Sequence, residues 1–563
     1  MTTPPSPPSD ATRVSTTTRT RQIGLCLSGG GYRATAWGIG AAVGLARASE
    51  TKPGTTVVSV SSVSGGSLAN AALAEASSKD FDELRAKELL TAVSPMLRHV
   101  AHHGLIRYAA ATNLPVFEAL ALGVLLAASA AGLVGALVGF DRQWQLDTVL
   151  FAGAVVAALL VGLALWRSRS ALLPERVALV ALAFVAPLAL ASGVVLGGRV
   201  EGTGVVVGTL VGLAAVTALV GWWFVWMVGR RGSLVERAMA TGPLRTDGDA
   251  KRGPRLLAEL QDRRVHHVFC ATELQSGDTF YLSPRMAYGY RFGWSGSLGD
   301  WPLARAVQAS AALPGGFPPQ RTRFTDIGLR PGAFSHRPRG ESQTPDEVVL
   351  VDGGVYDNMG TEWEVGFAAR RTRLGGEGGP LEAVQPPADF LIVANAGKAL
   401  ALTEMKQRGL RGELAGLLRD QSIQYDQTTS TRRRSLVAVF RAAEAGAADL
   451  PLGVIVQAST SPLRVAETIA AAGSDAPPEK RVRAAAWVTA LRDIDVDWHA
   501  LADRNAAVPT VLSPIGPDVT VDLVWHAAVL TQVQLHIHYG IGAVDPMERA
   551  LVEATVSTND QSE

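Results

Sequence analysis

Short apolar runs rich in β-branched residues recur in the two outer parts of the chain, at residues 23–28, 55–60, 266–272, 348–351 and 390–395. Runs of this length that are bounded by small or turn-forming residues are typical of buried strands. Segments of helical composition, such as the Ala-rich stretch that starts at Leu68, lie between them. Strands that alternate with helices predict an α/β fold with a mainly parallel sheet and helices on both faces.

Four long apolar stretches interrupt this pattern. They contain 22, 18, 21 and 24 residues without a charge, at 119–140, 149–166, 177–197 and 205–228. A bilayer core needs about 20 apolar residues in a helix. A buried bundle in a water-soluble domain would show amphipathic stripes, whereas these stretches are apolar all round. We therefore expect an inserted bundle of four transmembrane helices.

The basic residues near these stretches give the expected orientation. Arg167, Arg169 and Arg176 lie in the second link, on the side of the flanking α/β segments, whereas Arg142 and Arg199 lie on the other side. Basic residues are enriched in cytoplasmic loops. The sequence thus predicts an integral membrane protein, expected in a bacterial cell membrane, with its α/β domain and both termini in the cytoplasm.

The same patterns divide the chain into six expected segments. They are a disordered Pro-, Ser- and Thr-rich tail at 1–20, the first half of an α/β domain at 21–114, four transmembrane helices at 115–230, a polar linker at 231–255, the second half of the domain with a C-terminal extension at 256–545, and a flexible tail at 546–563.

Composition excludes some classes of function. The net charge of the 563 residues is +1, so charge indicates no nucleic-acid partner. Both cysteines, Cys26 and Cys270, lie in apolar strand-like runs, which favours small core residues over ligands or a disulfide. This is consistent with a reducing compartment.

A candidate nucleophile follows the second predicted strand, in the hexapeptide SVSGGS at 62–67. A strand that ends in small residues and turns at once into a helix is the setting of a nucleophile elbow, which holds a serine hydroxyl exposed on a strained turn. We assign Ser64 this role. Gly66 matches the elbow pattern, whereas Ser62 replaces its first glycine with another small residue. Ser/Gly runs also form ordinary loops.

A glycine triplet, Gly29-Gly30-Gly31, follows the first predicted strand and precedes a helix. Backbone N–H groups at such a junction converge at a helix N-terminus, where they can hold an oxyanion or a phosphate. A tight turn or a nucleotide loop would be the alternative, but the run lacks the Gly-Lys-Ser/Thr of a phosphate-binding loop. Gly65 is expected to add a fourth N–H group.

A candidate base follows the strand at 348–351, in the tripeptide Asp352-Gly353-Gly354. The carboxyl end of a strand presents an aspartate at the edge of the sheet. The two glycines allow another backbone segment to approach closely.

Together these motifs resemble the patatin-like phospholipase family. Gly29-Gly30-Gly31-x-Arg33 looks like its oxyanion motif, the segment around Ser64 its nucleophile elbow, and the Asp352 tripeptide its aspartate motif; residues 309–319 resemble its loop ahead of the aspartate strand. The resemblance covers about 21–115 and 254–400.

The resemblance implies a three-layer α/β sandwich and a Ser64-Asp352 dyad that needs no histidine, cofactor or metal. It implies a lipid acyl hydrolase, of phospholipase A or lysophospholipase type, whose partners are a bilayer and its phospholipid or lysophospholipid. Arg33 is expected to orient the glycine loop or to meet a lipid phosphate, with Gly66, Gly353 and Gly354 as supporting residues.

Several alternatives remain at this point. A Ser-Asp-His esterase of soluble esters would use a histidine after Asp352, and a non-catalytic membrane scaffold would carry a decayed hydrolase domain. The first histidine cluster forms either a solvated helix face or a metal site. The arginines Arg432, Arg433 and Arg434 either meet anionic headgroups or form a solvated helix end. The triad histidine would be His526, His536 or His538. A metal could also be bound by the pair His536 and His538, and the first histidine cluster consists of His99, His102 and His103.

Overall fold

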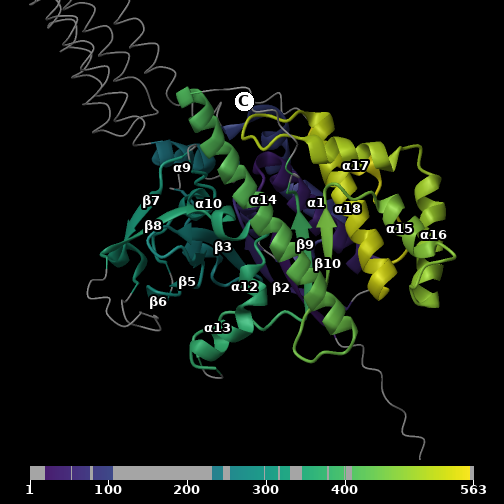
Figure 1. The fold of residues 1–563 in the computed structure, drawn as a ribbon, viewed down its shortest axis with the longest axis horizontal. Coiled ribbons are helices and arrows are strands. Elements are labelled where there is room, and N and C mark those ends of the chain that lie inside the picture. Colours follow the sequence, from purple (N-terminus) through teal and green to yellow (C-terminus); the bar gives the residue numbers. More distant parts are fainter. Residues whose placement is uncertain are drawn as a thin grey trace, which may run out of the picture.

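The computed structural model describes residues 20–51, 54–76, 80–105, 231–244, 254–296, 298–314, 317–329, 345–376, 379–397, 400 and 409–557. Their centre is a mixed sheet (Figure 1). Its strands are β1 (Arg21–Leu27), β2 (Thr55–Ser62), β3 (His266–Glu273), β4 (Thr279–Ser283), β5 (Met286–Gly289), β6 (Gly293–Ser295), β7 (Gln320–Arg323), β8 (Glu347–Asp352), β9 (Phe390–Asn395) and β10 (Leu452–Gln457).

The strand order is β10-β9-β1-β2-β3-β4-β5-β6. The pairs from β10 to β3 are parallel, so the predicted parallel sheet is present in this half. The strands from β4 to β6 continue it antiparallel, and β8 pairs antiparallel with both β3 and β7. Because parallel strands end at one edge of a sheet, the loops that follow β1 and β2 lie together.

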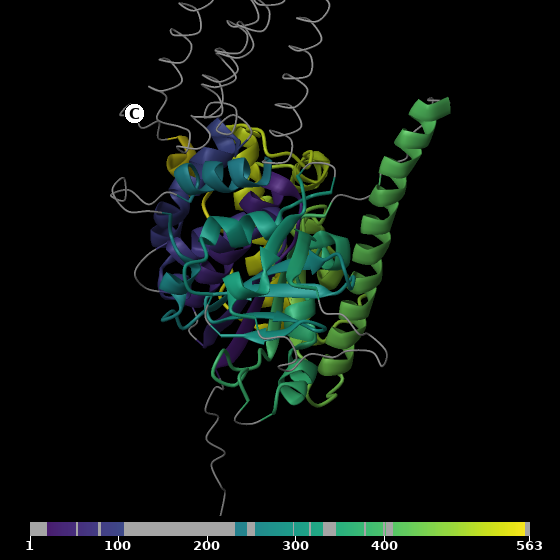
Figure 2. The same cartoon turned by 90° about the vertical axis from the view of Figure 1, so that its left-hand side faces the viewer.

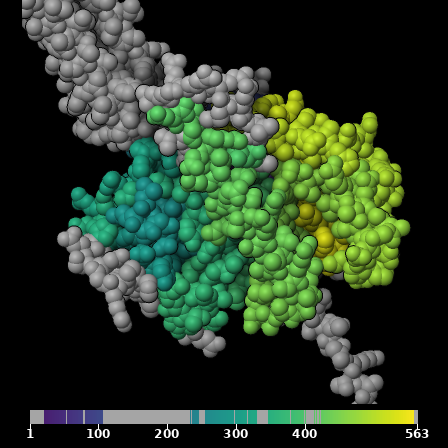
Figure 3. All heavy atoms as spheres, viewed as in Figure 1, coloured from purple at the N-terminus to yellow at the C-terminus, as the bar shows by residue number. Residues whose placement is uncertain are grey.

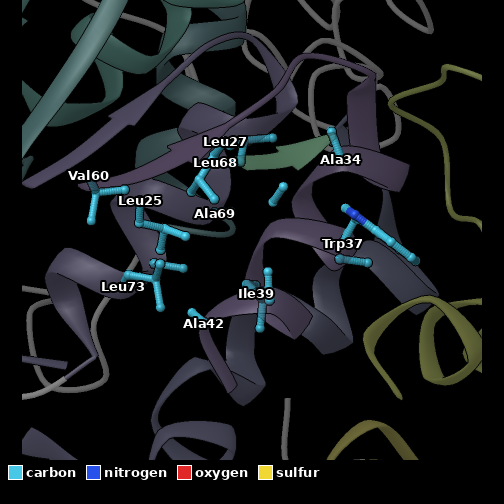
Figure 4. Close-up of a cluster of buried hydrophobic side chains, with 14 of the residues drawn as sticks. Leu25, Leu27, Ala34, Trp37, Ile39, Ala42, Val60, Leu68, Ala69 and Leu73 are labelled. Carbon is cyan, nitrogen blue, oxygen red and sulfur yellow. The ribbon is translucent and has the colours of Figure 1, made fainter. Parts of the chain in front are cut away.

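One face of the sheet is covered by α1 (Gly31–Thr51), α2 (Gly65–Glu75) and α3 (Ala86–Arg98). Leu25 of β1, Trp37 of α1 and Leu68 of α2 belong to the main hydrophobic core between the sheet and these helices (Figure 4). Burial of apolar surface on this scale is the main force that holds strand and helix together.

The helix α18 (Pro517–Tyr539) packs along α1. Glycines make the close contact possible, because a Cβ atom on Gly40 or Gly44 would lie 2.4 Å from the carbonyl oxygen of Val524 or Ala528, respectively. The C-terminal part of the chain is therefore an integral layer of the fold.

The opposite face carries the long helix α14 (Gly409–Glu444), whose Leu436 and Phe440 pack with Cys26 and Val393. Figure 2 shows α14 as a rod along one side of the fold, with one end extending past the sheet. The short helices α11 (Gly354–Asp357), α12 (Glu362–Val365) and α13 (Phe367–Arg373) follow β8.

The other helices in the described ranges are α9 (Arg231–Thr241), α10 (Leu303–Ser310), α15 (Pro462–Ala470), α16 (Pro478–Arg492), α17 (Trp498–Ala507) and α19 (Arg549–Ser557), with a π-helix at His99–His103 and short 3-10 turns at Phe81–Glu83, Leu257–Leu260 and Phe324–Ile327. Two of them correct the expected segments. A helix, α9, forms inside the predicted linker, and α19 buries Val552 and Val556 where a flexible tail was predicted.

The predicted membrane insertion and the predicted integral membrane localisation are contradicted and have to be corrected. Over the ranges that the structure describes, no helix is both long enough and apolar enough to cross a membrane. The four apolar stretches between 115 and 230, and the tail at 1–19, lie outside those ranges. The fold class that stands is a mixed α/β sheet with helices on both faces.

Candidate active site

Ser64 lies on the sharp turn between β2 and α2. As the N-cap of α2 it has φ 53° and ψ −123°, a backbone conformation that residues with a side chain rarely adopt. Its N–H donates to the carbonyl oxygen of Ser310 at 3.1 Å and lies 3.2 Å from the Ser310 hydroxyl. The turn is thus fixed by a neighbouring segment, as a nucleophile elbow requires.

Asp352 is the last residue of β8, and its side chain is only 1% exposed. The N–H of Gly354 donates to Oδ1 at 2.8 Å. Oδ2 has no hydrogen-bond partner of regular geometry among the described residues. Burial raises the pKa of this carboxyl to about 6, although the hydroxyl of Ser64 and the N–H of Gly354 act to lower it. The carboxylate form is therefore populated at neutral pH and basic enough to accept a proton.

Sheet topology brings these two residues together. β4 occupies one side of β3, and β2 and β8 follow each other along the other side, where Asp352 lies opposite Ala271. The carbonyl oxygen of Ser310 accepts hydrogen bonds from both Ser64 and Gly353, each at 3.1 Å. A Cβ atom on Gly353 would lie 2.2 Å from the carbonyl oxygen of Cys270, so only glycine fits there.

The glycine triplet lies beside the elbow. Gly31 is the first residue of α1 and Gly65 the first of α2, so their N–H groups have no partner inside their helices. In the described part of the chain, the N–H groups of Gly30, Gly31 and Gly65 donate to no other backbone segment, whereas Gly29 donates to Asn358 at 2.9 Å. The N–H group of Gly29 is thus engaged elsewhere, and those of the other three glycines are free of backbone acceptors, as the predicted oxyanion role requires.

Gly66, one of the supporting glycines, is in close backbone contact, as Gly353 is. A Cβ atom there would lie 2.6 Å from the carbonyl oxygens of Leu27 and Ser28, at the end of β1. The start of α2 is therefore pressed against the glycine loop, which brings the elbow and the loop into direct contact.

Arg33 lies in the first turn of α1 with 1% of its side chain exposed. Its guanidinium donates to the carbonyl oxygen of Val508 and, at 3.3 Å, to the hydroxyl of Thr510. The adjacent Tyr32 N–H donates to the carbonyl oxygen of Val511 at 2.9 Å. Burial lowers the pKa of Arg33 to about 10, so it remains a cation at neutral pH. These contacts favour the orienting role among the two expected for Arg33.

Two neighbours of Asp352 were missed by sequence reasoning. The ring of Tyr425, on α14, lies 2.9 Å from the position of a Cβ atom on Gly354. Its hydroxyl is buried without a hydrogen-bond partner among the described residues. Asn358 lies close to both Gly29 and Gly354. Neither residue belongs to a motif that a single sequence reveals.

The histidines of the alternative hypotheses have other partners. The ring of His526 hydrogen bonds with Asn505 at 3.1 Å and with the carbonyl oxygen of Thr460 at 2.9 Å, and His536 accepts from Trp487 at 3.0 Å. His536 and His538 are on a helix, where residues two apart point to different sides. A Ser-Asp-His triad and a metal pair at these positions are therefore not favoured.

The first histidine cluster is only partly a solvated face, because His102 is half-buried and His103 is exposed. His99 is buried, and its ring bonds with the hydroxyl of Tyr32 at 2.9 Å. Burial lowers the pKa of His99 to about 4, with a smaller effect of His103. Over the described ranges, no group of three or more possible metal ligands comes together.

Comparison with family models places the chain in a known family. A family model described as patatin-like phospholipase matches residues 25–362 of the 563, a span that includes the glycine triplet, Ser64 and Asp352. No curated protein matches the chain.

Proposed function

The chain belongs to the patatin-like phospholipase family and is a serine hydrolase that acts on lipid esters; from this premise we propose that it cleaves acyl esters of phospholipids or lysophospholipids with Ser64 as nucleophile and Asp352 as base. The observation that carries the proposal is the buried carboxyl of Asp352, which interacts with the hydroxyl of Ser64 and whose pKa burial raises to about 6. A serine hydroxyl needs such a base at neutral pH.

In the proposed first step, Oγ of Ser64 attacks the ester carbonyl carbon while its proton passes to Asp352. The tetrahedral intermediate carries its negative charge on the former carbonyl oxygen. When it collapses, the bond to the alcohol breaks, and the leaving oxygen takes the proton from Asp352. An acyl-enzyme on Ser64 and a lysolipid or glycerol-phosphate alcohol result.

The second step is hydrolysis of the acyl-enzyme. Asp352 takes a proton from water as the water oxygen attacks the acyl carbon. Collapse of this intermediate returns the proton to Oγ of Ser64 and releases a fatty acid. The site is then restored, and neither step oxidises or reduces any group.

The developing oxyanion is assigned to the N–H groups of Gly30, Gly31 and Gly65. Donors that are already in position for the charge of the transition state provide a large part of catalysis, and loss of one donor typically costs about a hundred- to a thousandfold in rate. In support, Gly31 and Gly65 begin α1 and α2, and helix N-termini favour negative charge.

The test compares Ser64→Ala, Asp352→Asn and the double variant on a phospholipid in detergent micelles. Each single variant is expected to lose nearly all activity, and the double variant is expected to be no slower, because both residues serve the same step. Ser435→Ala and Asp449→Asn, at exposed positions of α14 and of the loop after it, are the matched controls.

A fluorophosphonate probe gives an independent measurement, because it labels an activated serine covalently. Wild-type protein is expected to be labelled and Ser64→Ala to remain unlabelled. Labelling of Ser64→Ala, or a double variant much slower than both single variants, would count against the dyad. Hydrolysis of short soluble esters with no hydrolysis of any phospholipid or lysophospholipid would count against the proposed substrates.

A further inference from the structure

A groove separates the second half of α14 from the edge strand β10. Its volume is about 640 Å³. The lining residues are Arg433, Arg434, Val437, Ala438, Arg441, Ile455, Gln457 and Thr460. In Figure 3, which has the view of Figure 1, the green atoms of α14 lie on the face turned to the viewer, so this part of the protein belongs to the surface.

The groove combines positive charge with an apolar floor. Residues 427–443 contain four arginines and no acidic residue, and no carboxylate lines the groove. Arg434, Val437 and Arg441 share one side of the helix, because residues three and four apart are neighbours. The side chain of Val437 is 36% exposed, so apolar surface lies open between the guanidinium groups.

The four arginines are used differently. Arg432 does not line the groove. Its guanidinium pairs with Glu362 at 2.7 Å and lies over the ring of Tyr356. Arg433 donates to Gln457 at 2.9 Å. Among the described residues, Arg433, Arg434 and Arg441 have no acidic partner within ion-pair distance. Uncompensated arginines on one side of a helix are the kind of site that binds phosphate groups.

One end of the groove lies at the same edge of the sheet as the candidate active site. Gln457 is the last residue of β10, which is parallel to β9, β1 and β2, and Ser64 follows the end of β2. Along α14, Arg433 is eight residues from Tyr425, the neighbour of Gly354, which corresponds to about 12 Å.

We propose that this groove docks the protein on a lipid surface by binding the phosphate groups of anionic phospholipids. The proposal rests on the proposed function, because docking here would place the candidate active site beside its lipid substrates. The phosphates would pair with Arg433, Arg434 and Arg441, and the apolar floor would contact the glycerol and upper acyl region. Activity on vesicles should then depend on anionic lipid even when the hydrolysed lipid is zwitterionic.

Binding is measured first, in the Ser64→Ala background, so that the result does not depend on catalysis. The probe is a phosphatidylcholine vesicle with or without about 30% phosphatidylglycerol, and bound protein is counted after sedimentation. A basic residue near an anionic surface contributes about fivefold in affinity, so the triple variant R433Q/R434Q/R441Q is expected to bind roughly a hundredfold more weakly.

The matched control removes the same net charge elsewhere. R323Q/R464Q/R504Q changes three exposed arginines on β7, α15 and α17 and is expected to keep full binding. With Ser64 restored, the groove variant should lose most of its activity on anionic vesicles and keep its rate on a short soluble ester within about twofold. Inorganic phosphate at millimolar concentration should compete weakly, since it lacks the multiple contacts of a surface.

The proposal is overturned if the groove variant binds anionic vesicles as well as wild type, if the control triple loses binding equally, or if wild type binds zwitterionic vesicles equally well. Strong competition by millimolar phosphate would identify a soluble phosphate ligand instead. Loss of the soluble-ester activity in Ser64→Ala tests the proposed function separately, so the two proposals can fail independently.

Discussion

A Cβ atom on Gly65 would lie 2.0 Å from the carbonyl oxygen of Gly31. The first residue of α2 and the first residue of α1 are therefore in backbone contact, and this contact sets the distance between the elbow of Ser64 and the glycine loop. Two helix N-termini meet at this point, in a region from which the fold excludes even a methyl group.

Gly65→Ala is the direct test of that contact. The added methyl group has to displace the carbonyl of Gly31 and with it the N–H groups assigned to the oxyanion. We expect hydrolysis to fall at least a hundredfold, measured on a soluble ester beside a melting curve. Gly416→Ala on α14, where nothing lies within 4 Å of the added atom, should leave activity unchanged. Equal activity of the two variants would contradict the geometry.

Activity should depend on pH through Asp352. The proposed base acts as a carboxylate, so the rate should rise with pH and level off above the pKa of about 6. Tyr425→Ala removes the ring beside Gly354 and admits water, which should lower this pKa towards the ordinary 3.8 and shift the acid limb of kcat/KM to lower pH. Tyr425→Phe keeps the ring and should keep the wild-type profile. An unshifted profile in Tyr425→Ala would mean that the ring does not shield the carboxyl.

Arg33 is expected to act as a positioning residue for the glycine loop. Arg33→Gln loses the hydrogen bonds to Val508 and Thr510, so kcat on a soluble ester should fall about ten- to a thousandfold with little change in KM. Thr510→Val removes one partner and should have a smaller effect. A rise in KM for phospholipid with no effect on the soluble ester would favour contact between Arg33 and a lipid phosphate.

Glu364 makes stability depend on pH. Burial raises the pKa of this carboxyl from 4.5 to about 7, against the hydrogen bond that Ser59 donates at 2.6 Å. Between these two pH values, Glu364 is therefore protonated in the folded protein and ionised in the unfolded chain. The free energy of unfolding should fall as pH rises through this window and then level off. Glu364→Gln should flatten this slope in denaturant titrations at several pH values. A variant with the wild-type slope would exclude Glu364 as its source.

The motifs of the first half of the chain could be predicted because their chemistry is local. A glycine triplet after a strand and a serine before a glycine pair each specify a turn. Gly31 has the positive φ that a glycine allows, and Ser64 has the strained positive φ of a nucleophile elbow. The family match confirms the resemblance built on these motifs and the enzyme class. The roles of individual site residues remain predictions.

Other parts could not be predicted, for physical reasons. Val508 and Val511 support the glycine loop through backbone carbonyl groups, which every residue has, so no side-chain signal marks them. Tyr425 reaches Gly354 through tertiary packing alone. The prediction of membrane helices relied on hydropathy along the chain, and no described helix supports it.

The packing of α18 on α1 has a consequence for synthesis of the protein. The acceptor of Arg33 on Val508 is synthesised 475 residues after Arg33. Gly40 and Gly44 of α1 likewise contact residues of α18 that are added near the end of synthesis. A ribosome-bound nascent chain can form the elbow of Ser64 long before the loop beside it is supported. We therefore expect incomplete nascent chains to have no hydrolase activity. Activity on lipids should begin only when α18 has emerged from the ribosome.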